Sequence, residues 1–414
     1  MIKMLHFADV HIGMENYGRT DPHTGLSSRV MDFLHRMDDM IEYALDHDVD
    51  MVVFAGDAFK TRNPNPTYQR EFAHRVLDMA AHCPIVLLVG NHDTPSNTQR
   101  ASSVEVFETL RVPNVHVGMD YEVLQLETKA GPVQIGTAPY PVRSRLLYEE
   151  RDRTSGLSIA QLDGMLQDKL HSLLAEMAET VSKSDVPRVL TGHFTIHGAV
   201  LGSERQVMLG RDVMALLSSV ADEAWDYVAM GHIHKHQNMT GKTSGLPPVV
   251  YSGSLERIDF GEEGDDKGFC WVELERGNTQ WEFVQLKNVR PFVTLRIDTR
   301  KATNPTETVI REINRHDLQD AIVRILITAD PESDSALQAK AIEDAVLGQR
   351  ANVIAAIHRQ VERSERTRLG SNPEGLTASE LLERYLSTRD TPSDQVQTLL
   401  DAAEDIFRQV DDQF

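Results

Sequence analysis

The sequence is poor in cysteine and has no long apolar run. Its 414 residues include only two cysteines, Cys83 and Cys270, which lie far apart and form no CxxC pair. This spacing excludes a disulfide framework and a zinc ribbon. No run reaches the roughly 18 apolar residues of a membrane span, and Asp9 interrupts the apolar start too early for a secretory signal. We therefore expect a cytoplasmic protein.

Positive charge is scarce as well. The chain has 42 Lys and Arg residues against 63 Asp and Glu residues, which gives a formal net charge of −21. The electrostatic field of this negative charge repels polyphosphates, so any contact with DNA has to come from local basic patches or from bound metal cations. The contents of apolar (41%) and charged (25%) residues are those of an ordinary globular protein, and the length predicts two or three domains.

The apolar residues predict an α/β fold in the first two thirds of the chain. Short, nearly continuous apolar runs alternate with amphipathic stretches, which indicates strands that are covered on both faces. Strands are expected at residues 4–8, 51–55, 85–89, 133–136, 188–191 and 227–230, with helices at 29–47 and 67–81 among them.

A second α/β pattern begins near residue 290. Strands are expected at 293–297 and 321–328, helices at 305–315 and 335–347, and either a strand or a helix at 353–361. A polar stretch with glycine and proline follows and has the composition of a linker. We expect a first domain over 1–289, a small accessory α/β domain over 290–365, a linker over 366–376 and a pair of helices over 377–414.

Five of the expected strands end in a sharp turn that carries side chains able to bind metals. These turns are Asp9-Val10-His11, Gly56-Asp57, Gly90-Asn91-His92-Asp93, Gly192-His193 and Gly231-His232-Ile233-His234. Ligands of open α/β sheets bind beyond the carboxyl ends of the strands, so we expect the five turns to converge. Any one of them alone is more often a structural turn or a satisfied histidine. The ordered set of five favours a metal site.

The donor types fit two divalent cations of intermediate hardness, such as Mn²⁺ or Fe²⁺, with Zn²⁺ as an alternative. We assign to one cation Asp9, His11, Asp57 and His234, and to the other Asp57, Asn91, His193 and His232, so that Asp57 bridges them. Two such cations would activate a water and clamp an in-line displacement at phosphorus. His92 remains for proton donation to the leaving oxygen or for charge stabilisation, and Asp93 is expected to orient it.

The ordered motifs resemble those of the calcineurin-like metallophosphoesterases. Three further stretches narrow the resemblance to the SbcD-type branch of the Mre DNA-repair nucleases. They are Gly56-Asp57-Ala58-Phe59 followed by Arg62-Asn63-Pro64, then His197-Gly198-Ala199-Val200 with Gly202-Ser203-Glu204, and finally Tyr251-Ser252-Gly253-Ser254-Leu255-Glu256-Arg257 before Asp259-Phe260-Gly261-Glu262. The resemblance is specific over about residues 1–290.

The resemblance implies a two-sheet sandwich flanked by helices, with the accessory domain as a DNA-binding cap. It implies a Mn²⁺-dependent nuclease that trims double-stranded DNA ends from the 3′ side and nicks single strands, and that acts on DNA ends and hairpins in repair, recombination and replication. It also implies a homodimer bound to an SbcC-type ATPase subunit. Lys60 stands where many members of the family carry a histidine. Because lysine contacts phosphates but is a poor proton shuttle, the balance of exonuclease and endonuclease activity stays open.

Two further groups of residues carry expectations about binding. Arg143 and Arg145 belong to a local basic run, which is either a solvated face or a loop that contacts phosphates. The two tail helices, the first opened by a capping box of Thr377 and Glu380, carry an apolar stripe. It consists of Leu381, Leu382, Tyr385, Val396, Leu399, Leu400, Ala403, Ile406 and Phe407. The stripe either packs on its own chain or, as the resemblance favours, docks on the coiled coil of the ATPase.

Two other functions are alternatives at this point. A phosphoesterase of small substrates, such as cyclic nucleotides or nucleotides, would need neither the accessory domain nor the tail helices, which argues against it. A non-catalytic scaffold between an ATPase and DNA would not need a complete set of metal ligands, and every expected ligand is present.

Overall fold

The structure is a computed structural model that describes residues 1–95, 100–148, 156–202, 213–241, 245–362, 377–388 and 392–411. Some of the sequence-based expectations fall outside these residues. They are the linker over 366–376, Ser203 and Glu204 of the resemblance, and the last residues of the tail, 412–414. The side chain of Ile406 is also outside the description.

Two mixed sheets form the core of the first part of the chain. The first sheet contains, in spatial order, β14 (Gln280–Gln285), β13 (Gly268–Leu274), β1 (Ile2–Phe7), β2 (Met51–Phe54), β3 (Ile85–Leu88) and β4 (Val115–Gly118). The second contains β11 (Gln237–Asn238), β12 (Val249–Tyr251), β10 (Tyr227–Gly231), β7 (Arg188–His193), β6 (Gly131–Ala138) and β5 (Glu122–Thr128). The strands β1 to β4 are parallel, as are β12, β10, β7 and β6, whereas β13, β14, β11 and β5 are antiparallel to their neighbours. The expected strands are confirmed.

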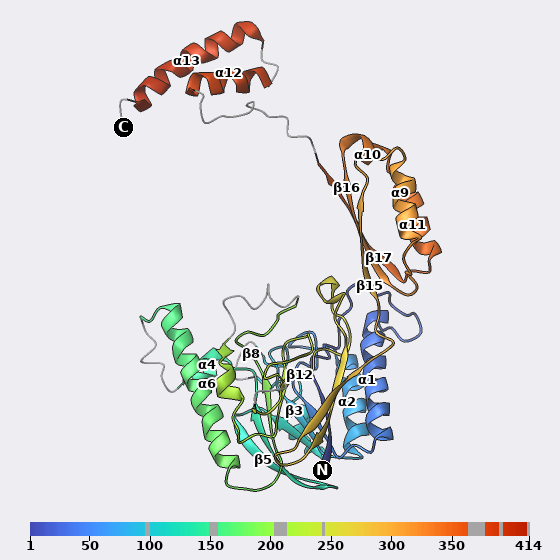
Figure 1. Ribbon diagram of the computed structural model, residues 1–414, viewed down its shortest axis with the longest axis vertical. Helices are drawn as coiled ribbons and strands as arrows, with labels where there is room; N and C mark the ends of the chain where they lie inside the picture. Colours follow the sequence, from blue (N-terminus) through green and yellow to red (C-terminus); the bar gives the residue numbers. More distant parts are fainter. Residues whose placement is uncertain are drawn as a thin grey trace. The chain divides into compact units, whose positions relative to one another are not determined.

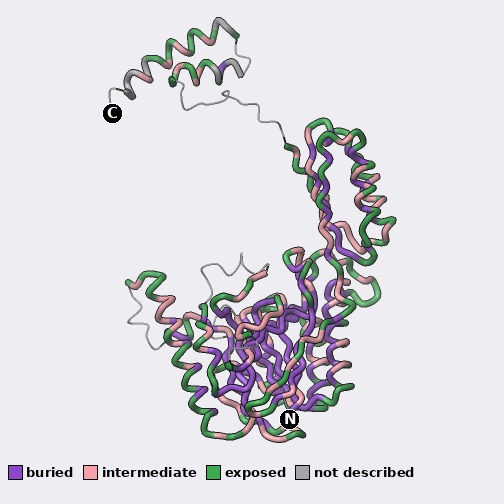
Figure 2. The backbone as a smooth tube through the Cα atoms, in the orientation of Figure 1, coloured by how far each residue is buried: buried purple, intermediate pink, exposed green. Residues whose placement is uncertain are grey.

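The two sheets stack between layers of helices (Figure 1). The helices α1 (Ser28–Asp46) and α2 (Pro66–Ala80) pack on the first sheet, where Phe54 and Phe72 belong to one apolar cluster. The helix α6 (Ile159–Val181), which the sequence analysis did not identify, packs on the second sheet. Met4 and Val189 belong to a third cluster, between the sheets. Both faces of the central strands are therefore buried (Figure 2), as their continuous apolar runs predict.

Local sequence explains where the long helices begin. The side chain of Ser27 caps α1 by accepting a bond from the amide of Arg29, and the side chain of Asn65 caps α2 ahead of Pro66. Each cap satisfies an amide that has no partner inside its helix. The shorter elements of this part are α3 (Val106–Thr109), α4 (Arg143–Leu146), α8 (Leu217–Val220), the 3₁₀ turn η2 (Phe260–Glu262), β8 (Thr195–Ile196) and β9 (Met214–Ala215).

A separate three-stranded sheet follows. Its strands are β15 (Phe292–Asp298), β16 (Ile322–Ala329) and β17 (Val353–Val361), accompanied by α9 (Pro305–Ile313), α10 (Pro331–Ala336) and α11 (Ala339–Gly348). Residues 353–361 thus form a strand. The helix expected at 335–347 is confirmed only from Ala339 on, as α11, because Leu337 has an extended backbone that separates α10 from α11.

The tail consists of α12 (Ala378–Thr388) and α13 (Ser393–Asp411), which pack against each other. Tertiary contacts divide the chain into two units. The first unit comprises Met1–Thr294, Leu318–Arg324 and Leu347–Ala355, and the second comprises Leu295–Asp317, Ile325–Val346 and Ala356–Phe414. Among the helices that the structure describes, none combines the length and apolar character that a membrane-spanning helix needs.

A buried histidine connects the two sheets. His6 on β1 is fully buried, with Nε2 3.2 Å from the carbonyl of Met230 and Nδ1 3.1 Å from the hydroxyl of Tyr227, both on β10. Because a carbonyl only accepts, Nε2 carries the proton of a neutral ring. Burial lowers the pKa of His6 to about 3.

We expect His6 to make the fold sensitive to acid. Its folded pKa lies below the unfolded value of about 6.5, so its stabilising effect is complete above that value and is lost as the pH falls below it. At about pH 5 the loss is about 2 kcal/mol. The His6→Gln variant keeps a donor and an acceptor but does not titrate. Its free energy of unfolding, measured with denaturant, should therefore decrease correspondingly less between about pH 7.5 and 5. Parallel decreases in the two proteins would contradict this role of His6.

Candidate metal centre

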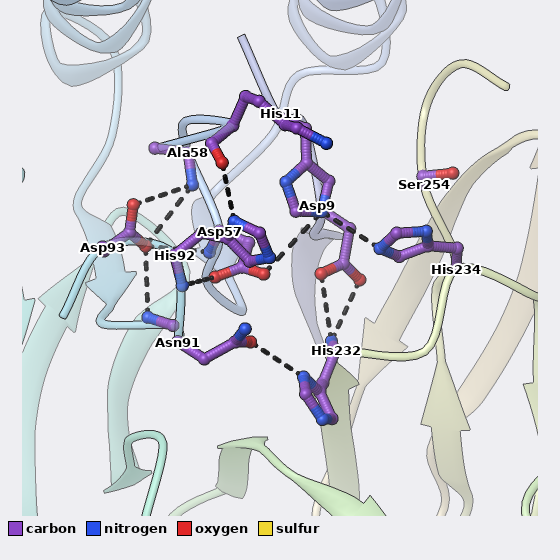
Figure 3. A network of polar contacts seen from close by, with 12 residues as sticks. Asp9, His11, Asp57, Ala58, Asn91, His92, Asp93, His232, His234 and Ser254 are labelled. Carbon is purple, nitrogen blue, oxygen red and sulfur yellow. Dashed lines mark hydrogen bonds and ion pairs between the residues drawn. The ribbon is translucent and has the colours of Figure 1, made fainter. Parts of the chain in front are cut away.

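Figure 3 shows residues of the turns that follow β1, β2, β3 and β10. Together with the turn at the end of β7, these turns meet at one edge of the two-sheet core. They follow β1, β2 and β3 in the first sheet and β7 and β10 in the second, as the strand order predicts. Four residues in these turns have a left-handed backbone although none is glycine: Asp9 (φ 54°), His11 (φ 49°), Asp57 (φ 63°) and His232 (φ 88°). Strained backbone of this kind concentrates at functional sites, where the surrounding structure holds it.

The expected donor atoms come together in groups. Asp9, His11 and His234 form one group in which all three donor atoms lie within 4.8 Å of one another. Asp57, His193 and His232 form a second group by the same measure. Each of these groups contains three of the four residues that the sequence analysis assigned to one cation.

Asn91 and Asp57 complete this arrangement. The Oδ1 atom of Asn91 lies 3.0 Å from Nε2 of His193 and 2.9 Å from Nδ1 of His232. The Oδ2 atom of Asp57 lies 3.4 Å from Nε2 of His193 and 3.7 Å from Nε2 of His11. Asp57 therefore stands between histidines of the two groups, as its assignment to both cations requires.

The charges of the centre fit divalent cations. Burial raises the pKa of Asp9 to about 7. Burial also raises the pKa of Asp57, but His193, His92 and His11 outweigh this effect and hold the pKa well below its ordinary value. The Nε2 atoms of His11 and His234 face each other at 3.0 Å. Two buried carboxylates among imidazole nitrogens and an amide oxygen form a donor set for divalent ions such as Mn²⁺, Fe²⁺ or Zn²⁺.

Two glycines permit this close approach. Gly56 has a φ of +98°, and a Cβ atom there would overlap Nδ1 of His193. A Cβ atom at Gly90 would overlap Oδ1 and the amide of Asp57. Side chains at these two positions would push the turns after β2 and β3 away from the other donor residues, which explains why these two motifs begin with glycine.

His92 lies at the centre, but its partner differs from the expected one. Its Nδ1 is 2.7 Å from the carbonyl of Lys60, and its ring stands 4.9 Å from that of His11. It also belongs to a potential donor group with His11 and Asp57. Since a carbonyl only accepts, Lys60 fixes a proton on Nδ1 of His92.

The expectation that Asp93 orients His92 is wrong. The buried carboxylate of Asp93 instead accepts bonds from the backbone amides of Asp57 (2.9 Å), Ala58 (3.1 Å) and Gly90 (3.1 Å), and from the hydroxyl of Ser103 (3.1 Å). The turn after β3 directs this side chain inward, where it fastens the turn after β2. Asp93 thus supports the backbone that carries Asp57.

Of the three basic residues expected to bind substrate, Arg145 lines a cavity of about 460 Å³ beside the centre, whereas Lys60 and Arg143 are not among its lining residues. Arg145 and Tyr140 line the cavity, and the ring of Tyr140 is 5.8 Å from that of His232. Arg145 forms an ion pair with Asp120. Arg143 pairs with Asp163 at 2.9 Å.

The apolar stripe of the tail is only partly covered. Tyr385 and Leu399 are exposed at 41% and 45%. The other described members of the stripe are half-buried, namely Leu381, Leu382, Val396, Leu400, Ala403 and Phe407. The pairing of α12 with α13 therefore leaves apolar side chains accessible within the tail.

The sequence analysis also missed a charged pair behind the centre. Glu262 contacts His234, and Lys267 contacts Glu262; both side chains are buried. The only signal was the position of Glu262 within the last stretch of the resemblance, which gave the residue no role.

Comparisons with known proteins show which family and which relatives the chain resembles. Residues 2–236 match the calcineurin-like phosphoesterase family. The chain is 26% identical to the SbcD component of the nuclease SbcCD of Rhodobacter capsulatus over 77% of each chain, and 26% identical to that of Escherichia coli (strain K12) over 74% of each. It is 25% identical to that of Bacillus subtilis (strain 168) over 70% of this chain and 71% of the relative. A dimetal phosphatase from Danio rerio is 12% identical and superposes with a TM-score of 0.40 over 68% of this chain and 95% of that one.

We expect Asp93→Asn to weaken the binding of divalent cations. An amide in place of the carboxylate leaves buried backbone N–H groups without an acceptor, which should lower the free energy of unfolding by about 2 kcal/mol or more. The Ser103→Ala variant is the matched control, since it removes one donor and should cost about 1 kcal/mol. Calorimetric titration with Mn²⁺ and denaturant unfolding measure both effects. Intact cation binding and stability with lost phosphoester hydrolysis would instead give Asp93 a role in the reaction.

Proposed function

Because the chain belongs to the calcineurin-like phosphoesterase family, we propose that it is the nuclease subunit of an SbcCD-type complex that processes DNA ends. In this role it hydrolyses DNA phosphodiesters as a 3′–5′ exonuclease on double strands and as an endonuclease on single strands, in repair, recombination and replication. The relatives named as the SbcD component of the nuclease SbcCD support the proposal, since the match extends over 70–77% of this chain.

The position of Asp57 is the observation that carries the proposal. Its carboxylate stands between His11 of one donor group and His193 of the other. We propose that one cation is held by Asp9, His11, Asp57 and His234, that the other is held by Asp57, Asn91, His193 and His232, and that Mn²⁺ fills both positions. Two bound cations supply an activated water and neutralise charge on the reacting phosphate.

The surrounding residues then act on the substrate. His92 is close to both Asp57 and His11 and is half-exposed, so it can reach a substrate. With its Nδ1 proton held by the carbonyl of Lys60, the doubly protonated ring would give its Nε2 proton to the leaving oxygen and become neutral. Lys60 can contact a phosphate beside it.

The cavity beside the centre suits a DNA strand. The cavity has a volume of about 460 Å³. Tyr140 gives its lining an aromatic surface beside the ring of His232, and Arg145 gives it a positive charge. Arg143 and Arg145 now pair with Asp163 and Asp120, and a phosphate can replace either carboxylate. These local cations are what a chain with a net charge of −21 needs to bind DNA.

The remaining segments are proposed to serve the complex. Residues 290–365 form the DNA-binding cap, residues 366–376 a linker, and α12 and α13 the surface that binds the coiled coil of an SbcC-type ATPase subunit. The exposed Tyr385 and Leu399 support the last assignment, because apolar side chains on a small helix pair require a cover. We further propose that two copies of the chain form a homodimer in the complex.

One experiment tests the function against its alternatives. End-labelled duplex DNA is incubated with the protein and Mn²⁺ or Mg²⁺, with and without the ATPase subunit, beside a small synthetic phosphodiester. Shortening of the DNA from its 3′ ends is the expected result. Hydrolysis of the small diester alone would favour a phosphoesterase of small substrates, and no hydrolysis of either would favour a scaffold.

We expect His92→Ala to separate cation binding from cleavage. Loss of a general acid should reduce the rate of DNA cleavage by roughly 10²- to 10⁴-fold, while the titration with Mn²⁺ stays close to that of the unchanged protein. His74→Ala, at an exposed position of α2, is the control and should cleave normally. If the cations leave together with the activity, His92 is a ligand.

We expect Leu400→Asp to abolish binding of the ATPase subunit. An unpaired carboxylate buried in a helix groove is costly, by about 2 kcal/mol or more. Gln395→Asp introduces the same charge at an exposed position of α13 and should bind normally. A pull-down with the purified ATPase subunit compares the two variants, and equal binding of both would show that the stripe is not the docking surface.

A further inference from the structure

His234 presents one ring nitrogen to the metal centre and the other to a buried carboxylate. Its Nε2 faces Nε2 of His11 at 3.0 Å, and its Nδ1 lies 2.8 Å from Oε1 of Glu262. An ionised carboxylate only accepts, so the proton of the neutral ring sits on Nδ1 and the lone pair of Nε2 faces the centre. Glu262 thereby fixes the tautomer and the rotation of His234.

Lys267 in turn fixes Glu262. The Nζ atom of Lys267 lies 2.8 Å from Oε2 of Glu262, and it donates to the carbonyl of His234 (3.0 Å) and to the hydroxyl of Ser254 (2.8 Å). The same Oε2 atom accepts from the amide of Ile258 (2.9 Å). Both charged side chains are buried, so water does not compete for these bonds. His234, Glu262 and Lys267 form a closed ring of contacts.

The two donor groups differ in the hydrogen-bond acceptor that lies behind their histidine rings. The Nδ1 atom of His193 lies 2.6 Å from a neutral backbone carbonyl, that of Ala55. In the group of Asp9, His11 and His234, Nδ1 of His11 is buried without a hydrogen-bond partner among the described residues, so the carboxylate of Glu262 reaches this group through His234. A carboxylate polarises an imidazole more strongly than a carbonyl does, because it adds a negative charge behind the ring. The carboxylate of Glu262 therefore polarises a ring in the group of Asp9, His11 and His234.

We propose that Glu262 and Lys267 are positioning residues that set the affinity of one of the two cation positions, the one formed with His234, and leave the other nearly unchanged. The inference rests on the two-cation arrangement proposed above. It gives a role to the stretch from Tyr251 to Glu262, which supplies Ser254 and Glu262 to the ring of contacts.

The test is a calorimetric titration of the full chain with Mn²⁺. The unchanged protein should bind two cations. Glu262→Gln should weaken one position by roughly 10- to 100-fold and change the other by less than about twofold. Asp265→Asn is the matched control, because Asp265 belongs to the same segment and pairs with Lys235 at 3.1 Å. This control should bind both cations normally.

A double variant separates positioning from stability. Glu262→Gln leaves the Lys267 ammonium buried without its counter-ion, so it should also lower the melting temperature of the cation-free protein. Adding Lys267→Met removes that charge and should recover part of the melting temperature, while the weakened position stays weak.

Three outcomes overturn the inference: unchanged affinities in Glu262→Gln, equal weakening of both positions, or recovery of affinity together with stability in the double variant. A different outcome concerns the proposed function instead. If the unchanged protein binds fewer than two cations, the two-cation arrangement itself is wrong.

Discussion

The centre depends on a carboxylate, that of Asp57, held where the two sheets meet. Asp57 follows β2 of the first sheet, and His193, which ends β7 of the second, faces it at 3.4 Å. A buried carboxylate is costly unless positive charge or hydrogen bonds surround it. The histidines, the amide of His92 and the turn that Asp93 fastens provide this compensation. The same contacts connect the strand ends of both sheets, so the fold and the centre stabilise each other.

Sequence reasoning identified β1, β2, β3, β6, β7 and β10 but not how they divide into sheets, and it missed the buried inner strands β12 and β13. Continuous apolar runs such as Met51–Phe54 mark a strand that is buried on both faces. The runs do not say which strands are neighbours, so β1 and β10 look alike in the sequence although they belong to different sheets. Sequence reasoning also missed the antiparallel edge strands β5 and β14, because only part of each strand is buried.

The candidate metal ligands were predictable from the sequence, whereas the residues that support them were not. Candidate ligands such as His11 and Asn91 lie at strand ends, and this position is visible in the sequence. The partner of a supporting residue depends on the path of the folded chain. Asp93 follows His92 directly, yet its carboxylate turns to the amide of Asp57, 36 positions earlier. Glu262 lies 28 positions after His234, a separation that carries no periodic signal.

The turn that carries Glu262 is itself held by the start of the three-stranded sheet. Phe260 packs against Phe292, with ring centres 4.9 Å apart, and the guanidinium of Arg324 lies 4.2 Å from the centre of the Phe260 ring. Glu263 accepts bonds from the amide and the hydroxyl of Thr294. The first residues of β15 and β16 are thus components of the phosphoesterase unit as well as of their own sheet. Replacing the accessory sheet with another module would therefore also change the surroundings of His234, a candidate metal ligand, through the turn that carries Glu262.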